Sequence, residues 1–234
     1  MLHLILLDCA LELVPSEISS MKQIQKHASR RGKKPNELLL DQTFHGQAMT
    51  KLSEHERRGR PDITYLSLMS ILETPLCKEG LLRVYLHLQD GRIVEVNSEV
   101  RLPRNYDRFV GLVEQLLYTG RVPPKGDPLL QIIDKTLDAL ISDLKAEYTL
   151  LAVEEGQETT IEGLAGLLPS DVSVPVIAGV GAFPHGAMSD STVELFEHKF
   201  ALDKEVMMTW HVCSELLWVY SLSVGVVKNR FSST

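Results

Sequence analysis

The sequence predicts one α/β domain built on a mostly parallel sheet that is flanked by helices. Short runs rich in aliphatic and β-branched residues alternate with longer segments of helical periodicity, which is the pattern of this fold class. A chain of 234 residues with 44% hydrophobic content is also large enough to bury one substantial core. We therefore expect a single domain over residues 1–234.

The expected elements follow from the spacing of apolar residues. The expected strands are Leu2–Leu7, Glu37–Leu40, Leu82–Leu88, Ile93–Val96, Tyr148–Val153 and Val172–Ala178. The expected helices are Ser16–Ala28, Ile63–Leu72, Asp107–Tyr118, Pro128–Leu144, Ile161–Leu167 and Val206–Val227. Thr159 and Glu162 have the spacing of a capping box for the helix Ile161–Leu167.

The cysteines and the first residues indicate the class of protein. Cys9, Cys77 and Cys213 stand far apart, with no CxxC pair and no histidine cluster, so neither a disulfide framework nor a metal site is expected. The N-terminal run MLHLILLD has no basic segment and is interrupted at Asp8, which favours a buried strand over a signal peptide. We expect a cytoplasmic protein.

The longest apolar stretch, Val206–Val227, is long enough to suggest a membrane span. His211 and Glu215 lie inside it, and polar groups of this kind are costly within a bilayer. A helix that is apolar on most of its surface also occurs in a protein core or at a subunit interface. We favour this second interpretation and expect no membrane anchor.

Charge is distributed unevenly along the chain, whose formal net charge is −7. Residues 1–125 contain 18 lysines and arginines against 15 carboxylates, whereas residues 126–234 contain 6 against 16. The overall balance argues against nucleic acid, but basic residues gathered on one face of the first half are compatible with RNA binding. The basic loop RRGKKP at 30–35 and the connector RVPPKGDP at 121–128 belong to this half or border it.

A basic turn leads into a helix in the segment KLSEHERRGRPDI, residues 51–63. Arg60 is expected to project from this turn, and Asp62 to hold its guanidinium in one direction through a charge-assisted hydrogen bond. The alternative is a solvated turn followed by an ordinary helix cap. This motif alone does not separate the two.

Three arginines surround Pro103 in the segment EVRLPRNYDRFVGLVEQLL, residues 99–117. Arg101 is expected to end a strand or loop, Arg104 to follow the proline, and Arg108 to lie in the first turn of a helix. Guanidinium groups there suit phosphate oxygens and stack on unpaired bases. The alternative is a set of surface salt bridges with the nearby carboxylates Glu99, Asp107 and Glu114.

A strand-like run enters a glycine-containing loop in VPVIAGVGAFPHG, residues 174–186. Gly179, Gly181 and Gly186 allow the backbone to approach a ligand closely. The GxGxxG spacing of a dinucleotide fingerprint is missing, and the segment after the first strand, DCALELVPSE, has no glycine. The loop therefore predicts a ligand site in a fold other than the Rossmann type.

These motifs together resemble a known family. The runs LLLDQTFHGQAM, RRGRPDITYLSLMSILETPLCKEGLLRVYLH and VRLPRNYDRFVGLVEQLL, with the later GAFPHG, are similar to SPOUT-class enzymes of ribosome biogenesis. Those enzymes methylate N1 of a pseudouridine in small-subunit rRNA. The resemblance is dense over residues 38–130, and it implies a SPOUT-type sheet, a C-terminal trefoil knot and a homodimer packed through Val206–Val227.

The resemblance also implies roles for individual residues. Arg60, Arg101, Arg104 and Arg108 match the arginines that contact RNA, and Asp62 matches the acid that steadies the first of them. GAFPHG matches the S-adenosyl-L-methionine loop, which places Gly181 and Gly186 at the cofactor. A second cofactor turn is altered here to ALDKEVM. The contacts expected from it are Leu202, Asp203, Lys204, Glu205, Val206 and Met207.

The implied reaction transfers a sulfonium methyl group to N1 of the pseudouridine. We expect Arg60 or Arg104 to stabilise the developing uracil anion, and Asp62 to act electrostatically or as a proton acceptor through water. Two alternatives remain open. One is an RNA-binding small-subunit assembly factor with weak or no methyl transfer, and the other is an enzyme for a pseudouridine in another RNA.

Overall fold

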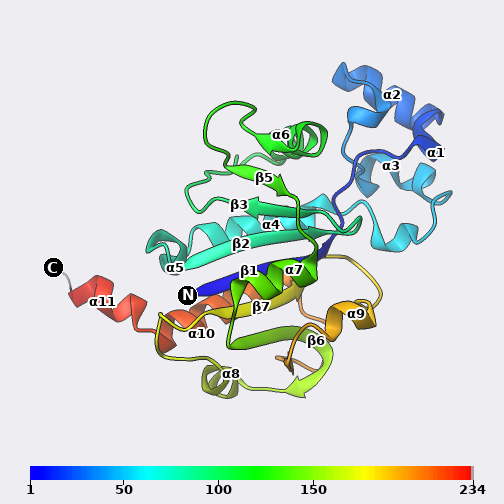
Figure 1. Ribbon diagram of the computed structural model, residues 1–234. Helices are drawn as coiled ribbons and strands as arrows, with labels where there is room; N and C mark the ends of the chain where they lie inside the picture. Colours follow the sequence, from blue (N-terminus) through cyan, green and yellow to red (C-terminus); the bar gives the residue numbers. More distant parts are fainter. Residues whose placement is uncertain (233–234) are drawn as a thin grey trace.

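An eight-stranded sheet runs through the computed structural model, which describes residues 1–232 (Figure 1). Residues 233 and 234 of the expected domain lie outside the described residues. The strand order is β4-β5-β3-β2-β1-β7-β6-β8. The strands are β1 Leu2–Cys9, β2 Leu82–Leu88, β3 Ile93–Val96, β4 Arg121–Val122, β5 Leu130–Ile133, β6 Tyr148–Glu158, β7 Val176–Gly181 and β8 His198–Ala201. From β2 to β8 all neighbours pair in parallel, and β3, β5 and β4 complete one edge in antiparallel pairing.

Helices cover both faces of the sheet (Figure 1). The α-helices are α1 Ser16–Ser19, α2 Lys22–Arg31, α3 Gln42–Met49, α4 Pro61–Leu72, α5 Pro75–Lys78, α6 Tyr106–Thr119, α7 Leu137–Leu144, α8 Ile161–Leu167, α9 Asp190–Val193, α10 Thr209–Ser223 and α11 Val226–Ser232. Two 3-10 turns, η1 Pro35–Glu37 and η2 His55–Arg57, lie between helices.

The central strand β1 shows why the sheet is buried on both faces. Leu4 and Leu6 belong to the larger core, which α4, α6 and α10 also supply. Ile5 and Leu7 point to the opposite face and pack in a second core with residues of α7. All four side chains are fully buried, as expected for a central parallel strand that is apolar at almost every position.

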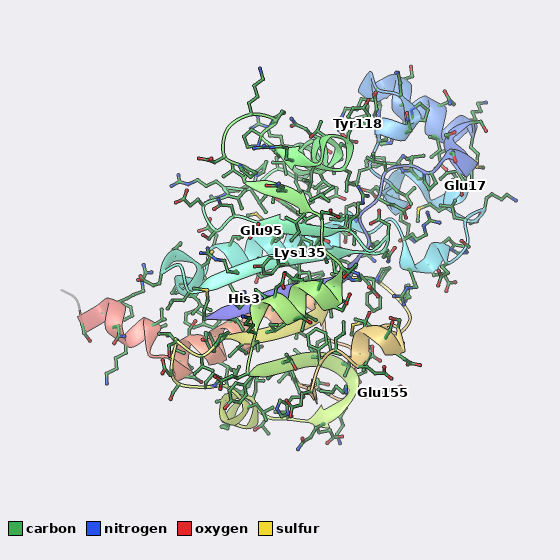
Figure 2. All side chains as sticks on the ribbon, viewed as in Figure 1. His3, Glu17, Glu95, Tyr118, Lys135 and Glu155 are labelled. Carbon is green, nitrogen blue, oxygen red and sulfur yellow. The ribbon has the colours of Figure 1, made fainter. Side chains whose placement is uncertain are left out.

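A small helical lobe formed by α1, α2 and α3 stands beyond the carboxyl end of β1 (Figure 1). It has its own apolar cluster, which includes Ile18, Ile24 and Leu38. Glu17 marks the outer side of this lobe in Figure 2. The lobe therefore adds a separate surface beside the sheet.

Two expected elements are wrong, because a segment becomes a strand only where it pairs with a neighbouring strand, whatever its local sequence pattern. Glu37–Leu40 is not a strand: η1 ends at Glu37, and Leu39 forms only an isolated bridge with Leu13. The expected helix Pro128–Leu144 is a strand in its first part, because Leu130–Ile133 pairs with β3 as β5. Only Leu137–Leu144 is helical.

Several boundaries also differ from expectation. The helix expected over Ser16–Ala28 divides into α1 and α2, and the last expected helix begins at Thr209 and breaks after Ser223. The expected strand Val172–Ala178 begins at Val176, while α3 and β8 were not expected. The capping box is also wrong, because the side chain of Thr160 rather than Thr159 accepts the N–H of Gly163, at 3.1 Å.

The apolar segment near the C-terminus packs on α4 and the sheet. Leu216, Leu217 and Tyr220 of α10 are fully buried. In residues 1–232 no single helix is long and apolar enough to cross a membrane. Helices α10 and α11 together reach that length and hydropathy, but the pair is bent by 59°.

Candidate active site

A cavity of about 590 Å³ opens between α3, α4 and α6. Its lining residues are Gln42, Thr43, Arg60, Asp62, Tyr65, Leu66 and Tyr106. The turn before α4 is held against α3, because the N–H of Gln42 donates to the carbonyl of Gly59 at 2.8 Å. Gly59 has φ +64°, a left-handed conformation that favours glycine, and a Cβ there would lie 2.7 Å from the Met49 methyl group.

The Arg60 side chain is fixed by Asp62 in two parallel hydrogen bonds. Arg60 Nε donates to Asp62 Oδ1 and Arg60 Nη2 donates to Oδ2, both at 2.8 Å. The hydrogen bond to Asp62 raises the pKa of Arg60 above its ordinary value, so the guanidinium stays charged. The expectation that Asp62 orients Arg60 is confirmed in its geometry.

A second pair, Tyr106 and Asp41, supports the cavity wall. The Tyr106 hydroxyl donates to Asp41 Oδ2 at 2.8 Å, while Asp41 Oδ1 caps α3 by accepting the N–H of Thr43 at 2.8 Å. Burial, and then the hydrogen bond to Asp41, raises the pKa of Tyr106, so the phenol keeps its proton. The sequence analysis missed this pair. The available signal was Asp41 as an N-cap before QTFHGQAM.

The three arginines around Pro103 are exposed, and none of them forms an ion pair with a described residue. The salt-bridge alternative is therefore wrong for Arg101, Arg104 and Arg108. Glu114 instead binds Arg31 at 3.2 Å and Lys33 at 2.6 Å.

None of these three arginines is a lining residue of the cavity, but two are connected to residues that are. The carbonyl of Arg104 accepts the hydroxyl of the lining residue Tyr65 at 2.5 Å. Arg108 lies in the first turn of α6, as expected, two residues after Tyr106, and its N–H is capped by Asn105. Arg101 lies in the preceding loop and does not line the cavity.

The two expected cofactor loops follow the parallel strands β7 and β8 at their carboxyl ends, where α/β folds place ligands. Thr209 Oγ1 donates to the Gly181 carbonyl at 2.7 Å and so joins the end of β7 to the start of α10. Gly186 has φ +88°. Between β8 and α10, Leu202 and Met207 are half-buried.

These loops fit a nucleoside cofactor through their main chain. Residues 203–206 are exposed, and the two half-buried apolar side chains, Leu202 and Met207, flank them. The other loop begins at Gly181 and ends at Gly186, the two positions in it that carry no Cβ atom. Residues 202–207 are not among the lining residues of the cavity between α3, α4 and α6.

Arg57 links the glycine loop to the turn that carries Arg60. Its Nη1 donates to the carbonyl of Ala187 at 2.6 Å and its Nη2 to Asp8 Oδ2 at 3.1 Å. Its guanidinium also lies 4.2 Å from the ring centroid of Phe183. A Cβ at Gly186 would lie 2.8 Å from Arg57 Nη1. Sequence reasoning missed this role, because the partners come from two segments that are distant from Arg57 in the sequence.

The cysteines show no sign of nucleophilic chemistry. Burial raises the pKa of Cys9 to about 12 and also raises the pKa of Cys77 and Cys213, so all three remain thiols. Across the described residues, no group of three or more histidine, cysteine or acidic side chains is arranged to hold a metal ion.

The fold of this chain, including the loops after β7 and β8, is similar to that of a solved structure, which shows the class of the protein. The structure of Archaeoglobus fulgidus Nep1 bound to S-adenosylhomocysteine is similar to this chain with a TM-score of 0.83 and 33% sequence identity, covering 95% of this chain and 98% of that one. The fold is accordingly that of a SPOUT-class methyltransferase.

Sequence comparison identifies the family within that class. The chain matches the family described as EMG1/NEP1 methyltransferase over residues 4–220 and belongs to it. Two relatives are named ribosomal RNA small subunit methyltransferase Nep1. The Thermococcus sibiricus protein is 44% identical, covering 96% of this chain and 99% of the relative, and the Staphylothermus marinus protein is 42% identical, covering 92% and 93%.

Proposed function

We propose that this enzyme, an rRNA methyltransferase by family, transfers a methyl group to N1 of a pseudouridine in small-subunit rRNA. The observation that carries the proposal is the cavity in which Asp62 fixes Arg60. Arg104 is joined to the lining residue Tyr65 through its carbonyl, and Arg108 follows the lining residue Tyr106 on α6. A flipped-out base needs a pocket of this kind, with donors for its carbonyl oxygens and aromatic walls for stacking.

The methyl donor is S-adenosyl-L-methionine, which supplies an electrophilic methyl group on sulfur. Its demethylated product is the ligand of the Archaeoglobus fulgidus relative. Gly181 and Gly186 of the first loop and residues Leu202–Met207 of the second would hold it, the glycines because they lack side chains.

Arg60 has the donors that the substrate base requires. A guanidinium has five N–H groups, and Asp62 accepts two of them, so three remain for a uracil oxygen or a phosphate. Because Asp62 holds the group still, little conformational freedom is lost when the base binds. Asp62 favours loss of the N1 proton electrostatically or accepts it through water, while Arg60 and Arg104 stabilise the anion that forms.

The proposed enzyme is a homodimer that works in the cytoplasm, where small subunits are assembled. Trp218 and Leu222, one turn apart on α10, are 48% and 67% exposed, and Met208 at the start of the same helix is 59% exposed. Large apolar side chains that gather on one helix are typical of a subunit interface. A trefoil knot at the C-terminus stays a prediction.

Two substitutions test the RNA role. Arg104→Ala and Arg108→Ala should each weaken RNA binding, and each should reduce the slope of log affinity against log salt by about 0.7 to 0.9, since a phosphate contact is lost. Neither should change the affinity for S-adenosylhomocysteine, measured by calorimetry. Lys228→Ala, which removes an exposed cation on α11, is the matched control. Unchanged RNA affinity in both arginine variants contradicts the proposal.

The altered turn Leu202–Met207 favours a second candidate, an assembly factor that binds rRNA with weak or no methyl transfer. Calorimetry with S-adenosyl-L-methionine separates the two, because the assembly factor would show no binding. Mass spectrometry of rRNA nucleosides from cells that lack the protein is decisive: loss of N1-methylpseudouridine supports the enzyme, and an unchanged nucleoside profile supports the assembly factor.

A further inference from the structure

We propose that helix α2 carries a second RNA-binding surface, which holds a single-stranded segment next to the modified nucleotide. The surface consists of Lys22, Lys26 and Arg30 and is called the α2 basic face below. It rests on the proposed rRNA substrate, but it involves residues outside the cavity and outside the cofactor loops. None of its three members belongs to the arginine group around Arg60 and Pro103.

The α2 basic face is one continuous stripe. Its residues are spaced by four, so they project from the same side of the helix, about 6 Å apart along the axis. All three are exposed, whereas Ile24 and Ala28 on the opposite side are buried in the lobe. The helix therefore presents three cations in a row to solvent.

These three charges are not neutralised within the protein. In the described part of the chain, no carboxylate forms an ion pair with Lys22, Lys26 or Arg30. The next basic residues behave differently, because Arg31 and Lys33 both bind Glu114. Glu114 is only 3% exposed, so this contact anchors the lobe to α6, and the stripe keeps its positive charge.

The carboxylates nearest in sequence are engaged elsewhere. Glu17 accepts the Ser16 hydroxyl at 3.3 Å, and Glu37 accepts the N–H of Lys34 at 3.0 Å. Gln25 and Ser29, the other exposed side chains of α2, are uncharged. Helix α2 itself therefore contributes no carboxylate beside the three cations.

The α2 basic face begins at the edge of the cavity. The Arg30 guanidinium lies over the ring of Phe44, 5.5 Å from its centroid, and His27 lies on the same ring with centroids 4.6 Å apart. Phe44 directly follows Thr43, which lines the cavity. Helices α2 and α3 lie side by side in the lobe (Figure 1), so a chain that leaves the cavity past Thr43 meets Arg30 first.

The chemistry of this face fits single-stranded RNA. A planar guanidinium held on an aromatic ring can stack on an unpaired base and bond a phosphate, and the two lysines can follow the backbone as point charges. Such contacts do not read sequence. The α2 basic face would thus add affinity and hold the flanking strand, while the cavity selects the nucleotide.

The test uses the full chain and two synthetic RNAs. One is a short single-stranded RNA with a central pseudouridine, and the other is the same RNA extended by single-stranded segments on both sides of that nucleotide. Binding of the triple variant Lys22→Ala/Lys26→Ala/Arg30→Ala is measured by fluorescence anisotropy over a salt series. For the extended RNA we expect roughly tenfold weaker binding and a salt slope that is smaller by about 2, because single-strand contacts contribute about 0.7 each.

The short RNA should bind the triple variant as tightly as it binds the unmodified protein. The single variant Arg30→Lys should show the salt slope of the unmodified protein but bind the extended RNA more weakly. Lysine keeps the positive charge and lacks the planar group that stacks on a base. Lys228→Ala is the charge control and should bind both RNAs normally. The inference is overturned if the triple variant binds the extended RNA normally, or loses both RNAs equally. Arg104→Ala, tested in parallel, reports separately on the proposed function.

Discussion

Arg57 is the residue whose role depends most on three-dimensional contact. It joins the end of β1 through Asp8 and the glycine loop through the Ala187 carbonyl and the Phe183 ring. Its own carbonyl accepts the side-chain amide of Gln89 at 2.7 Å. One side chain thus orders the loop expected to hold the cofactor and sits three residues before Arg60.

Arg57→Ala should weaken binding of S-adenosylhomocysteine by about tenfold, since a loop that is no longer fixed must be ordered when the ligand binds. Isothermal calorimetry measures this change. Arg57→Lys keeps the charge but not the paired geometry and should recover only part of the affinity. The matched control is Arg92→Ala, which removes an arginine whose partner, Asp90, lies in the same hairpin. Equal cofactor affinity in Arg57→Ala and the unmodified protein would refute this role.

At the scale of elements, the start of α3 connects a histidine pair, the buried His45 and the half-buried His27, to the cavity. His45 Nδ1 accepts the N–H of Asp41 at 3.1 Å, so the neutral ring carries its proton on Nε2 and donates it to His27 Nδ1 at 2.7 Å. Asp41 in turn binds Tyr106 at the cavity wall. A proton added to His45 would remove the acceptor from the Asp41 N–H.

Acid should therefore destabilise the fold through His45. Burial, and then the neighbouring His27, lowers the pKa of His45 from 6.5 to about 4, so the unfolded chain binds a proton that the folded chain does not. The stability that this histidine contributes is complete above pH 6.5 and is lost as the pH falls toward 4, at up to about 1.4 kcal/mol per pH unit.

Urea unfolding at several pH values measures this loss. His45→Gln should show a smaller slope of unfolding free energy against pH between 6.5 and 4. Part of the slope should remain, because burial also lowers the pKa of His3 to about 4. The exposed His185→Gln is the control and should keep the original slope. A slope in His45→Gln equal to that of the unmodified protein would contradict the assignment.

For the whole molecule, the exposed side chains of α10 bear on the state of association. Leu222→Asp places a charge on a 67% exposed position, so the monomer should fold normally while a dimer formed through α10 should dissociate. Sedimentation velocity reports the change. Tyr118→Asp removes a 65% exposed aromatic from α6 and should leave the dimer intact. A Leu222→Asp variant that still sediments as a dimer would place the interface elsewhere.

Much of the fold and part of the site could be predicted because they depend on short-range pattern. The runs Leu82–Leu88 and Ile93–Val96 are strands as expected, since their apolar residues leave little choice of conformation. The Arg60–Asp62 pair could be predicted for the same reason: its members are two positions apart, and the turn before α4 sets their geometry.

Contacts between distant segments were decided only by the tertiary structure. Asp41 and Tyr106 are 65 positions apart, and Arg57 and Ala187 are 130 apart, so neither pairing leaves a signal in local spacing. Leu130–Ile133 became a strand because β3 offered a free edge. Residue type and spacing thus determined which groups carry the chemistry. The packing of the lobe, α6 and the glycine loop around the sheet decided which groups meet, because burial and hydrogen bonding are satisfied across the chain.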